Sequence, residues 1–211
     1  MNDNDIIQKY FGSEIDARQA GQFAAMREIY AEWNARINVV SRKDIDSLCL
    51  HHVLHSLAIA RVCRFGAGAR VIDIGCGGGF PCVPLAVLFP EVHFVGVDSV
   101  GKKIRVVQEV CRALGIDNLT AVNARIESLG NRADYVVSRA VADLPALVRW
   151  AWPHIDAGQA GTLPNGLLCL KGGQLDDEIA ATGRRVERWR IAEMFDEEYF
   201  LTKEVLYIRK A

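Results

Sequence analysis

The sequence predicts an α/β protein with a mostly parallel, Rossmann-like sheet, and two observations carry this prediction. From Arg70 onward, short apolar runs rich in β-branched residues alternate with helix-compatible runs, which is the pattern of a parallel sheet covered on both faces. The stretch VIDIGCGGGFPCVPLA, residues 71–86, passes from an apolar strand through a cluster of glycines into a helix. Strand, glycine turn and helix in that order are typical of nucleotide-binding α/β folds.

Seven strands are predicted in this region, with helices between most of them. The strands are expected at 70–74, 92–97, 119–122, 134–138, 166–170, about 186–193 and 203–209, and the helices at about 83–89, 101–114, 143–152 and 174–181. No helix is expected between the last two strands, so they should form a C-terminal antiparallel hairpin. A seven-stranded parallel sheet with one antiparallel strand near its edge is the class I methyltransferase architecture.

The first third of the chain is predicted to be helical. Apolar residues recur at roughly helical spacing within 14–34 and again within 45–64. We therefore expect a single domain over residues 1–211, in which an N-terminal helical region, 1–66, precedes a cofactor-binding α/β core, 67–211.

The glycine turn and the acid that follows the second strand predict a bound adenosine-type cofactor. Asp98 ends that strand, where an acidic residue holds the ribose hydroxyls in nucleotide-binding folds. Gly75, Gly77 and Gly79 form a G-x-G-x-G pattern, and Phe80 stands where the dinucleotide fingerprint requires glycine. The alternative is a glycine turn that binds no ligand.

The start of the following helix indicates which cofactor is bound. Pro81 and Pro84 remove N–H donors at the point where a pyrophosphate would be cradled. The loop is therefore suited to a cofactor without phosphate, such as S-adenosylmethionine. Asp73, just before the glycines, is a candidate to neutralise the ammonium or sulfonium side of such a cofactor.

Further candidates stand at the ends of the later strands, on the side where ligands bind in such sheets. Ile126 and Glu127 follow the third strand and are expected beside the adenine. Arg139 ends the fourth strand and Lys171 ends the fifth, and we interpret both as catalytic residues that face the substrate. The alternative for Arg139 and Lys171 is a surface ion pair.

Composition limits the classes of partner. The formal net charge is −1, so RNA would have to be bound by local basic patches. The candidates are Arg42-Lys43, Lys102-Lys103-Arg105, Arg125, Arg139, Lys171 and the cluster Arg184, Arg185, Arg188 and Arg190. No stretch is apolar enough to span a bilayer and the N-terminus lacks a signal-peptide core, so a cytoplasmic protein without membrane contact is expected. The six cysteines show no zinc spacing, and no metal is expected.

These pieces together resemble the RsmG (GidB) family of bacterial 16S ribosomal RNA guanine-N7 methyltransferases. The matching residues run through nearly the whole chain: Trp33-Asn34-x-x-Ile37-Asn38, His52-Val53-Leu54-x-Ser56, Asp73 to Ala86, Asp98-Ser99-x-x-Lys102-Lys103, Ser138-Arg139-Ala140 and Leu170-Lys171-Gly172. Two positions depart from the family pattern: Cys82 replaces a glycine and His55 an aspartate.

The resemblance implies a function, a partner and a set of contacts. S-adenosylmethionine would be contacted by Gly75, Phe80, Ile126, Glu127 and Arg139, and its methyl group would go to a guanine N7. The expected partner is 16S ribosomal RNA or the small ribosomal subunit, without DNA, and the protein is expected to be a monomer. Methylation of another RNA or of a small molecule is the alternative reading.

Methyl transfer to guanine N7 needs no general base, because the nitrogen has a free lone pair and no proton to remove. The absence of an obvious catalytic dyad is therefore expected, and rate enhancement should come from proximity and orientation. A dehydrogenase is disfavoured by Phe80 and the two prolines. A non-catalytic RNA-binding protein is disfavoured by the intact loop and Asp98.

Overall fold

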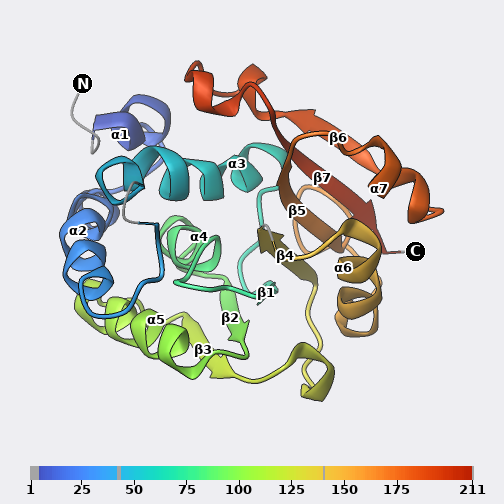
Figure 1. Cartoon of the computed structure of the whole chain (residues 1–211), viewed down its shortest axis with the longest axis horizontal. Coiled ribbons are helices and arrows are strands. Elements are labelled where there is room, and N and C mark those ends of the chain that lie inside the picture. Colours follow the sequence, from blue (N-terminus) through green and yellow to red (C-terminus); the bar gives the residue numbers. More distant parts are fainter. Residues whose placement is uncertain (1–4, 42–43, 140, 211) are drawn as a thin grey trace.

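A computed structural model describes residues 5–41, 44–139 and 141–210 of the chain. Its centre is a seven-stranded sheet in the order β3-β2-β1-β4-β5-β7-β6 (Figure 1). The strands are β1 (Arg70–Ile74), β2 (His93–Asp98), β3 (Leu119–Asn123), β4 (Tyr135–Arg139), β5 (Gly166–Gly172), β6 (Glu187–Arg190) and β7 (Lys203–Arg209). The pairs from β3 to β5 are parallel, and β7 is antiparallel to both β5 and β6.

The predicted α/β fold with a mostly parallel sheet and a C-terminal antiparallel pair is confirmed. The hairpin departs from the simplest form, because β7 is inserted between β5 and β6. The connection between β6 and β7 also contains two short 3₁₀ turns, Ile191–Glu193 and Glu198–Phe200. The first of these turns occupies the end of the predicted sixth strand, which is therefore shorter than expected.

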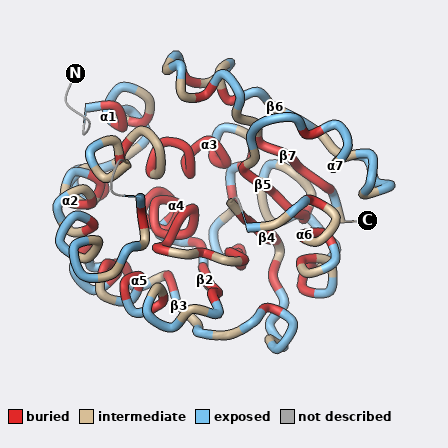
Figure 2. Tube along the Cα trace, viewed as in Figure 1, coloured by how far each residue is buried: buried red, intermediate tan, exposed pale blue. Residues whose placement is uncertain are grey.

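Helices cover both faces of the sheet. One face carries α1 (Asp5–Phe11), α2 (Ala17–Asn34), α3 (His55–Val62), α4 (Cys82–Leu88) and α5 (Gly101–Leu114). The other carries α6 (Leu144–Ala151) and α7 (Asp176–Ala181). Successive strand residues point to opposite faces, so Val71 joins the first core and Ile72 the second. The buried segments in Figure 2 are concentrated in β1, β2, β4, β5 and β7 and in α3 and α4, whereas β3 and β6 are more exposed.

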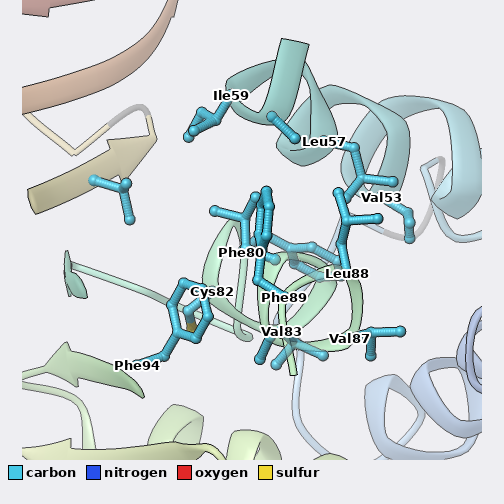
Figure 3. Close-up of a cluster of buried hydrophobic side chains, with 14 of the residues drawn as sticks. Val53, Leu57, Ile59, Phe80, Cys82, Val83, Val87, Leu88, Phe89 and Phe94 are labelled. Atoms are coloured by element: carbon cyan, nitrogen blue, oxygen red, sulfur yellow. The ribbon is translucent and has the colours of Figure 1, made fainter. Parts of the chain in front are cut away.

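Helix α4 is the most completely enclosed helix next to the glycine loop. All of its residues, Cys82 to Leu88, are buried. Figure 3 shows Leu57 of α3 and Val53, just before α3, packed toward Leu88, while Phe80 lies beside them. A helix buried on all sides is held by packing rather than by an amphipathic face. The glycine loop leads into α4, so the C-terminal end of the loop is anchored by the packing of this helix.

The predicted helix over 45–64 is wrong as a single element. A 3₁₀ turn (Ile45–Ser47) is followed by a π-helix, η2 (Cys49–Leu54), and only then by α3. The wider π-turn changes which residues share a face, so Val53 and Leu54 are buried while the rings of His51 and His52 are half-buried. The helix expected over 14–34 is present as α2, and α1 precedes it without having been predicted.

Helix α2 begins with a reciprocal cap that also ties it to the core. The Gln19 backbone N–H donates to Asp16 Oδ1 at 2.8 Å, and the Asp16 N–H donates to Gln19 Oε1 at 2.8 Å. The Gln19 side chain then donates to the Val87 carbonyl at the end of α4, at 2.8 Å. This capping box satisfies helix-end donors and positions α2 against α4. Among the described residues, no helix has the length and apolar character to cross a membrane.

Candidate active site

The carboxyl ends of the parallel strands meet at a cleft. The strand order reverses between β1 and β4, and ligands bind at such a switch point in open α/β sheets. The larger of two adjoining cavities there has a volume of about 720 Å³ and the smaller of about 300 Å³. Gly75, Asp98, Lys103 and Val141 line both. A single extended ligand can therefore occupy the two cavities together.

Glycine is required at Gly75 for two reasons. Its backbone has φ of +66°, a left-handed conformation that favours glycine. A Cβ at this position would also lie 2.6 Å from Val141 Cγ2. The bare backbone therefore forms the floor where the two cavities join.

Asp98, at the end of β2, holds the glycine loop in place. Its Oδ2 accepts the Gly77 backbone N–H at 3.0 Å and its Oδ1 accepts the Val100 N–H at 2.8 Å. The carboxylate is mostly buried, yet it lines both cavities. Each carboxylate oxygen accepts more than one hydrogen bond, so Asp98 can also accept bonds from a pair of ligand hydroxyls.

The start of α4 has no donor left for a phosphate. Pro81 and Pro84 have no N–H, the Cys82 N–H donates to Asp73 Oδ2 at 3.0 Å, and the Val83 N–H donates to the Gly79 carbonyl at 2.7 Å. Phosphate sites at helix N-termini depend on free N–H groups. The geometry therefore favours a ligand without a pyrophosphate at this position.

Asp73 carries a buried carboxyl directly beneath the loop. Burial raises its pKa to about 7, because the charged form loses its hydration. Within the described residues, its Oδ1 is buried and has no hydrogen-bond partner. Asp73 does not line either cavity, so a cation in the cleft would act on it through the loop rather than by contact.

The residues predicted for cofactor binding are brought together by the fold. Gly75, Gly77, Phe80, Asp98 and Arg139 line the larger cavity. Ile126 and Glu127 line the smaller one, where Trp150 of α6 forms a further wall. Gly79, at the end of the loop, and Asp73, before it, are buried. Among these nine, only Gly79 and Asp73 are therefore separated from the cavities, and both support the loop that lines them.

Arg139, at the end of β4, is half-buried, and its guanidinium contacts two residues of η2 and the ring of Phe80. Its Nη1 donates to the His51 carbonyl at 3.2 Å, and its Nη2 lies 2.8 Å from His52 Nδ1. The guanidinium also lies 5.3 Å from the centre of the Phe80 ring. Burial lowers the pKa of Arg139, although an arginine remains charged at neutral pH. A fixed positive charge therefore faces the larger cavity.

Lys171 lines the same cavity, but its ammonium is engaged elsewhere. Its Nζ donates to Glu178 Oε2 at 2.5 Å and to the Ala142 carbonyl at 2.8 Å, and its side chain is only 8% exposed. Glu178 in turn accepts the Leu144 N–H at 2.9 Å. The Lys171–Glu178 ion pair and these hydrogen bonds connect β5, α7 and the start of α6. The predicted catalytic role of Lys171 stays a prediction, and its geometry favours a supporting one.

The N-terminal region completes the cofactor loop, which the sequence analysis did not foresee. The buried Tyr30 hydroxyl of α2 donates to the Gly78 carbonyl at 2.7 Å. Asn34 Oδ1 accepts the N–H groups of Val39 at 2.8 Å and Val40 at 2.9 Å. This turn places Val39 against Gly78, where a Cβ would lie 2.9 Å from the valine Cβ. The W-N-x-x-I-N stretch was a signal for this turn, without indicating its role.

The far wall of the larger cavity comes from residues to which the sequence analysis assigned no site role. It is formed by His52 of η2, His55 of α3, Tyr199 of the β6–β7 connection and Lys203 at the start of β7. The His51 ring stacks on the Tyr199 ring with centroids 4.1 Å apart, and Lys203 Nζ lies 5.0 Å from the Tyr199 ring centre. Residues far apart in sequence build this wall, so no local pattern could have identified it.

The predicted basic patches separate in space. Lys102 is exposed beside the cleft, and Lys103 lines both cavities. In the other cluster, Arg188 pairs with Glu204 at 2.7 Å, and Arg184 lies over the Trp152 ring at 3.8 Å. Arg42, Lys43 and Ala140 lie outside the described residues. Of these two described clusters, the lysines at the start of α5 are therefore the one that adjoins the cleft.

The sheet order and the cleft define the class I methyltransferase fold, and solved structures share it. A magnesium protoporphyrin IX methyltransferase from Synechocystis, with bound S-adenosylmethionine, superposes with a TM-score of 0.58 at 18% identity and covers 100% of this chain and 98% of its own. A precorrin-6y C5,15-methyltransferase from Geobacter metallireducens gives a TM-score of 0.56 at 10% identity, over 83% and 92%.

The family is shown by sequence. Residues 19–198 match the family described as rRNA small subunit methyltransferase G, so this chain belongs to that family. It is 49% identical over 203 residues to ribosomal RNA small subunit methyltransferase G of Bacteroides fragilis, covering 96% of this chain and 98% of the relative. The protein of the same name from Porphyromonas gingivalis is 50% identical over 205 residues, covering 97% and 92%. The resemblance inferred from the motifs is confirmed.

Proposed function

We propose that this protein transfers the methyl group of S-adenosylmethionine to N7 of a guanine in 16S ribosomal RNA. The observation that carries the proposal is the pair of adjoining cavities that share Gly75 and Asp98. The smaller cavity suits an adenosine group, and the larger leaves room for a methionyl chain and an incoming base. Membership of the rRNA small subunit methyltransferase G family supports RNA as the substrate.

The residues of the cleft fit this cofactor in three ways. Asp98 would accept the ribose hydroxyls while it holds Gly77 and Val100. Ile126 and Glu127 would lie beside the adenine. The start of α4 offers no free N–H to a phosphate, and among the described residues the buried Asp73 Oδ1 has no hydrogen-bond partner. Both features suit a cationic ligand without phosphate.

The bound cofactor supplies an electrophilic methyl group on a sulfonium. The transfer would form a bond between that carbon and guanine N7 and break its bond to sulfur, so positive charge would move from sulfur to the purine. The chain would contribute proximity and alignment, worth up to roughly 7–11 kcal/mol in well-aligned cases. No proton has to be removed, so the neutral imidazoles in the wall are compatible with this chemistry.

Arg139 would orient the reactants rather than take part in bond exchange. An arginine can bind guanine through O6 and N7, but N7 must stay free for methylation. Arg139 is therefore expected to contact O6, a phosphate or the carboxylate of the cofactor. Lys102 and Lys103, beside the cleft, would hold the RNA backbone.

The proposal extends to the domain organisation, the location and the partner of the protein. A single domain would act as a cytoplasmic monomer on RNA or on the small ribosomal subunit, without DNA. The N-terminal region would complete the cleft through Tyr30 and Val39, which hold the glycine loop.

The test is methylation of small-subunit RNA and of small-subunit particles, with mapping of N7-methylguanine. Wild-type protein is expected to modify one guanine, and Arg139→Lys to lose most of the single-turnover rate, because lysine lacks the planar fork. Arg149→Lys is the matched control, since Arg149 is an exposed arginine of α6 outside both cavities. Methylation by Arg139→Lys at the wild-type rate would remove Arg139 from the reaction.

Cofactor binding is tested separately by calorimetry. Asp98→Ala is expected to weaken binding of S-adenosylmethionine by about 1.5–3 kcal/mol, the value of hydrogen bonds to a charged acceptor. Asp117→Ala, at an exposed aspartate before β3, serves as the control. Binding of NAD by the wild-type protein, or unchanged affinity in Asp98→Ala, would contradict the cofactor assignment.

A further inference from the structure

The guanidinium of Arg139 is oriented by two consecutive residues of the π-helix. The His51 carbonyl accepts from Nη1 at 3.2 Å, and the His52 ring meets Nη2 at 2.8 Å through Nδ1. Phe80 lies below both groups, with its ring centre 5.3 Å from the guanidinium carbon and 5.1 Å from the His52 ring centre. The arginine is therefore held by a carbonyl, an imidazole and an aromatic face.

The direction of the short contact fixes the state of His52. A guanidinium has donors and no acceptor, so His52 Nδ1 must accept and must carry a lone pair. The ring is then the neutral tautomer with its proton on Nε2. Burial and the nearby Arg139 charge lower the pKa of His52 to about 3, which agrees with a neutral ring. The contact is thus one between a cation and an uncharged acceptor.

The π-helix places His52 for this contact. The Ser56 hydroxyl donates to the His52 carbonyl at 2.6 Å, and η2 is the segment in which the i to i+5 pattern replaces the α-helical one. Within the described residues, His52 Nε2 is buried and has no hydrogen-bond partner. A buried donor without a partner is unfavourable, so this nitrogen reduces what the ring contributes to stability.

The carboxylates nearby are engaged with other groups. Asp44 Oδ1 lies 2.9 Å from His51 Nδ1, and Asp44 Oδ2 accepts from the Ser41 hydroxyl at 2.8 Å. Asp73 lies below the loop and accepts from the Cys82 N–H. No ion pair between Arg139 and an acidic residue is formed among the described residues.

We propose that His52 is a positioning residue that orients Arg139 through a neutral acceptor and so leaves the arginine charge available to an anionic or carbonyl group of the bound reactants. The inference rests on the proposed function, because it assigns Arg139 to the reaction. A carboxylate partner would also orient the guanidinium, but it would cancel the charge. The imidazole provides orientation without neutralisation.

Three substitutions at His52 separate geometry from charge. His52→Asn retains a neutral acceptor near the position of Nδ1, His52→Leu removes the acceptor, and His52→Asp supplies a charged one. Single-turnover methylation of small-subunit particles is expected to stay within about threefold of wild type for His52→Asn. His52→Leu and His52→Asp should each be slower by about tenfold to a hundredfold, the range for a hydrogen bond to a charged group.

A double-mutant comparison shows whether His52 acts through Arg139. In the Arg139→Lys background, His52→Leu is expected to cost less than about threefold, because the guanidinium that it orients is already gone. His93→Leu is the control, since His93 is exposed at the amino end of β2, remote from the cleft. Thermal melting of every variant reports separately on folding. Equal losses from His52→Leu in both backgrounds, or a His52→Asp variant as fast as His52→Asn, would overturn the proposal.

Nitrogen NMR of labelled histidine gives a readout that does not depend on methylation. At pH 7 the His52 signals of the wild-type protein are expected to show a bare Nδ1 and a protonated Nε2, and His52→Asn identifies them by their loss. A protonated Nδ1 would overturn the proposal. A wild-type protein that methylates no ribosomal RNA would instead refute the proposed function, and the tautomer would still decide whether His52 holds Arg139.

Discussion

Replacing Tyr30 by phenylalanine tests whether the N-terminal helices support the cofactor loop. The Tyr30 ring is fully buried, and its hydroxyl donates to the Gly78 carbonyl at 2.7 Å. Phenylalanine keeps the packing against Phe80, whose ring centre lies 4.8 Å away, but it leaves the carbonyl without this donor. The substitution therefore removes one interaction between α2 and the loop and little else.

The size of the effect follows from the burial of the bond. A buried acceptor left unsatisfied costs about 1–3 kcal/mol, and each kcal/mol shifts the melting temperature of a chain of this length by roughly 2–4 °C. The same loosening should weaken S-adenosylmethionine binding, because the cofactor must then order the loop. The loss in binding free energy cannot exceed the lost bond, so it is bounded at about 3 kcal/mol.

The assay pairs urea denaturation with calorimetric titration of the cofactor. Tyr207→Phe is the matched control, because the Tyr207 hydroxyl of β7 donates to the Pro164 carbonyl at the same distance, 2.7 Å, near the amino end of β5 rather than at the glycine loop. Both variants should lose stability, and only Tyr30→Phe should lose cofactor affinity. An unchanged urea midpoint for Tyr30→Phe, or equal affinity losses in the two variants, would refute the reasoning.

Three further predictions concern charged residues. Burial raises the folded-state pKa of Asp73 to about 7, above the unfolded value of about 4. The Asp73 contribution to the free energy of unfolding is therefore full below about pH 4 and is lost as pH rises to about 7. Asp73→Asn should remove this pH dependence of stability in urea denaturation, and wild-type and variant stabilities that change in parallel with pH would contradict the prediction. Replacing Lys102 and Lys103 by alanine should weaken RNA binding and reduce the salt slope of the affinity by roughly 0.7–0.9 per lost phosphate contact; an unchanged slope would mean that neither lysine contacts RNA. Lys171→Met should lower stability by about 1–3 kcal/mol in thermal melting, because Glu178 loses its ion-pair partner and keeps only the Leu144 N–H while remaining partly solvated. Unchanged melting with lost methylation would favour the catalytic role instead.

Local sequence patterns predicted the elements that depend on local causes. Val71 to Ile74 is a β-branched strand, and Gly75 follows it because the turn needs a left-handed residue. Asp98 could be assigned to the ligand side because the ends of parallel strands meet at one edge. The two prolines indicated a start of α4 without free donors, and the structure accounts for each remaining N–H there.

The π-helix was not predicted because periodicity does not distinguish it from an α-helix over so few residues. The segment Cys49–Leu54 contains the apolar residues of an ordinary buried helix. Its wider turn is settled by contacts to other parts of the chain, among them Arg139 with the His51 carbonyl and Tyr199 with the His51 ring. A sequence pattern contains no information on those contacts.

The sequence by itself determined the class of the sheet, the glycine loop, the acid at Asp98 and the family. These depend on backbone conformation, on strand periodicity and on motifs of adjacent residues, all of which are local. Only the tertiary structure decided that Tyr30 holds the loop, that Lys171 is committed to Glu178, and that a neutral His52 faces Arg139. Each of these depends on which side chain of a distant segment supplies the hydrogen-bond partner, and packing of the whole chain selects that partner.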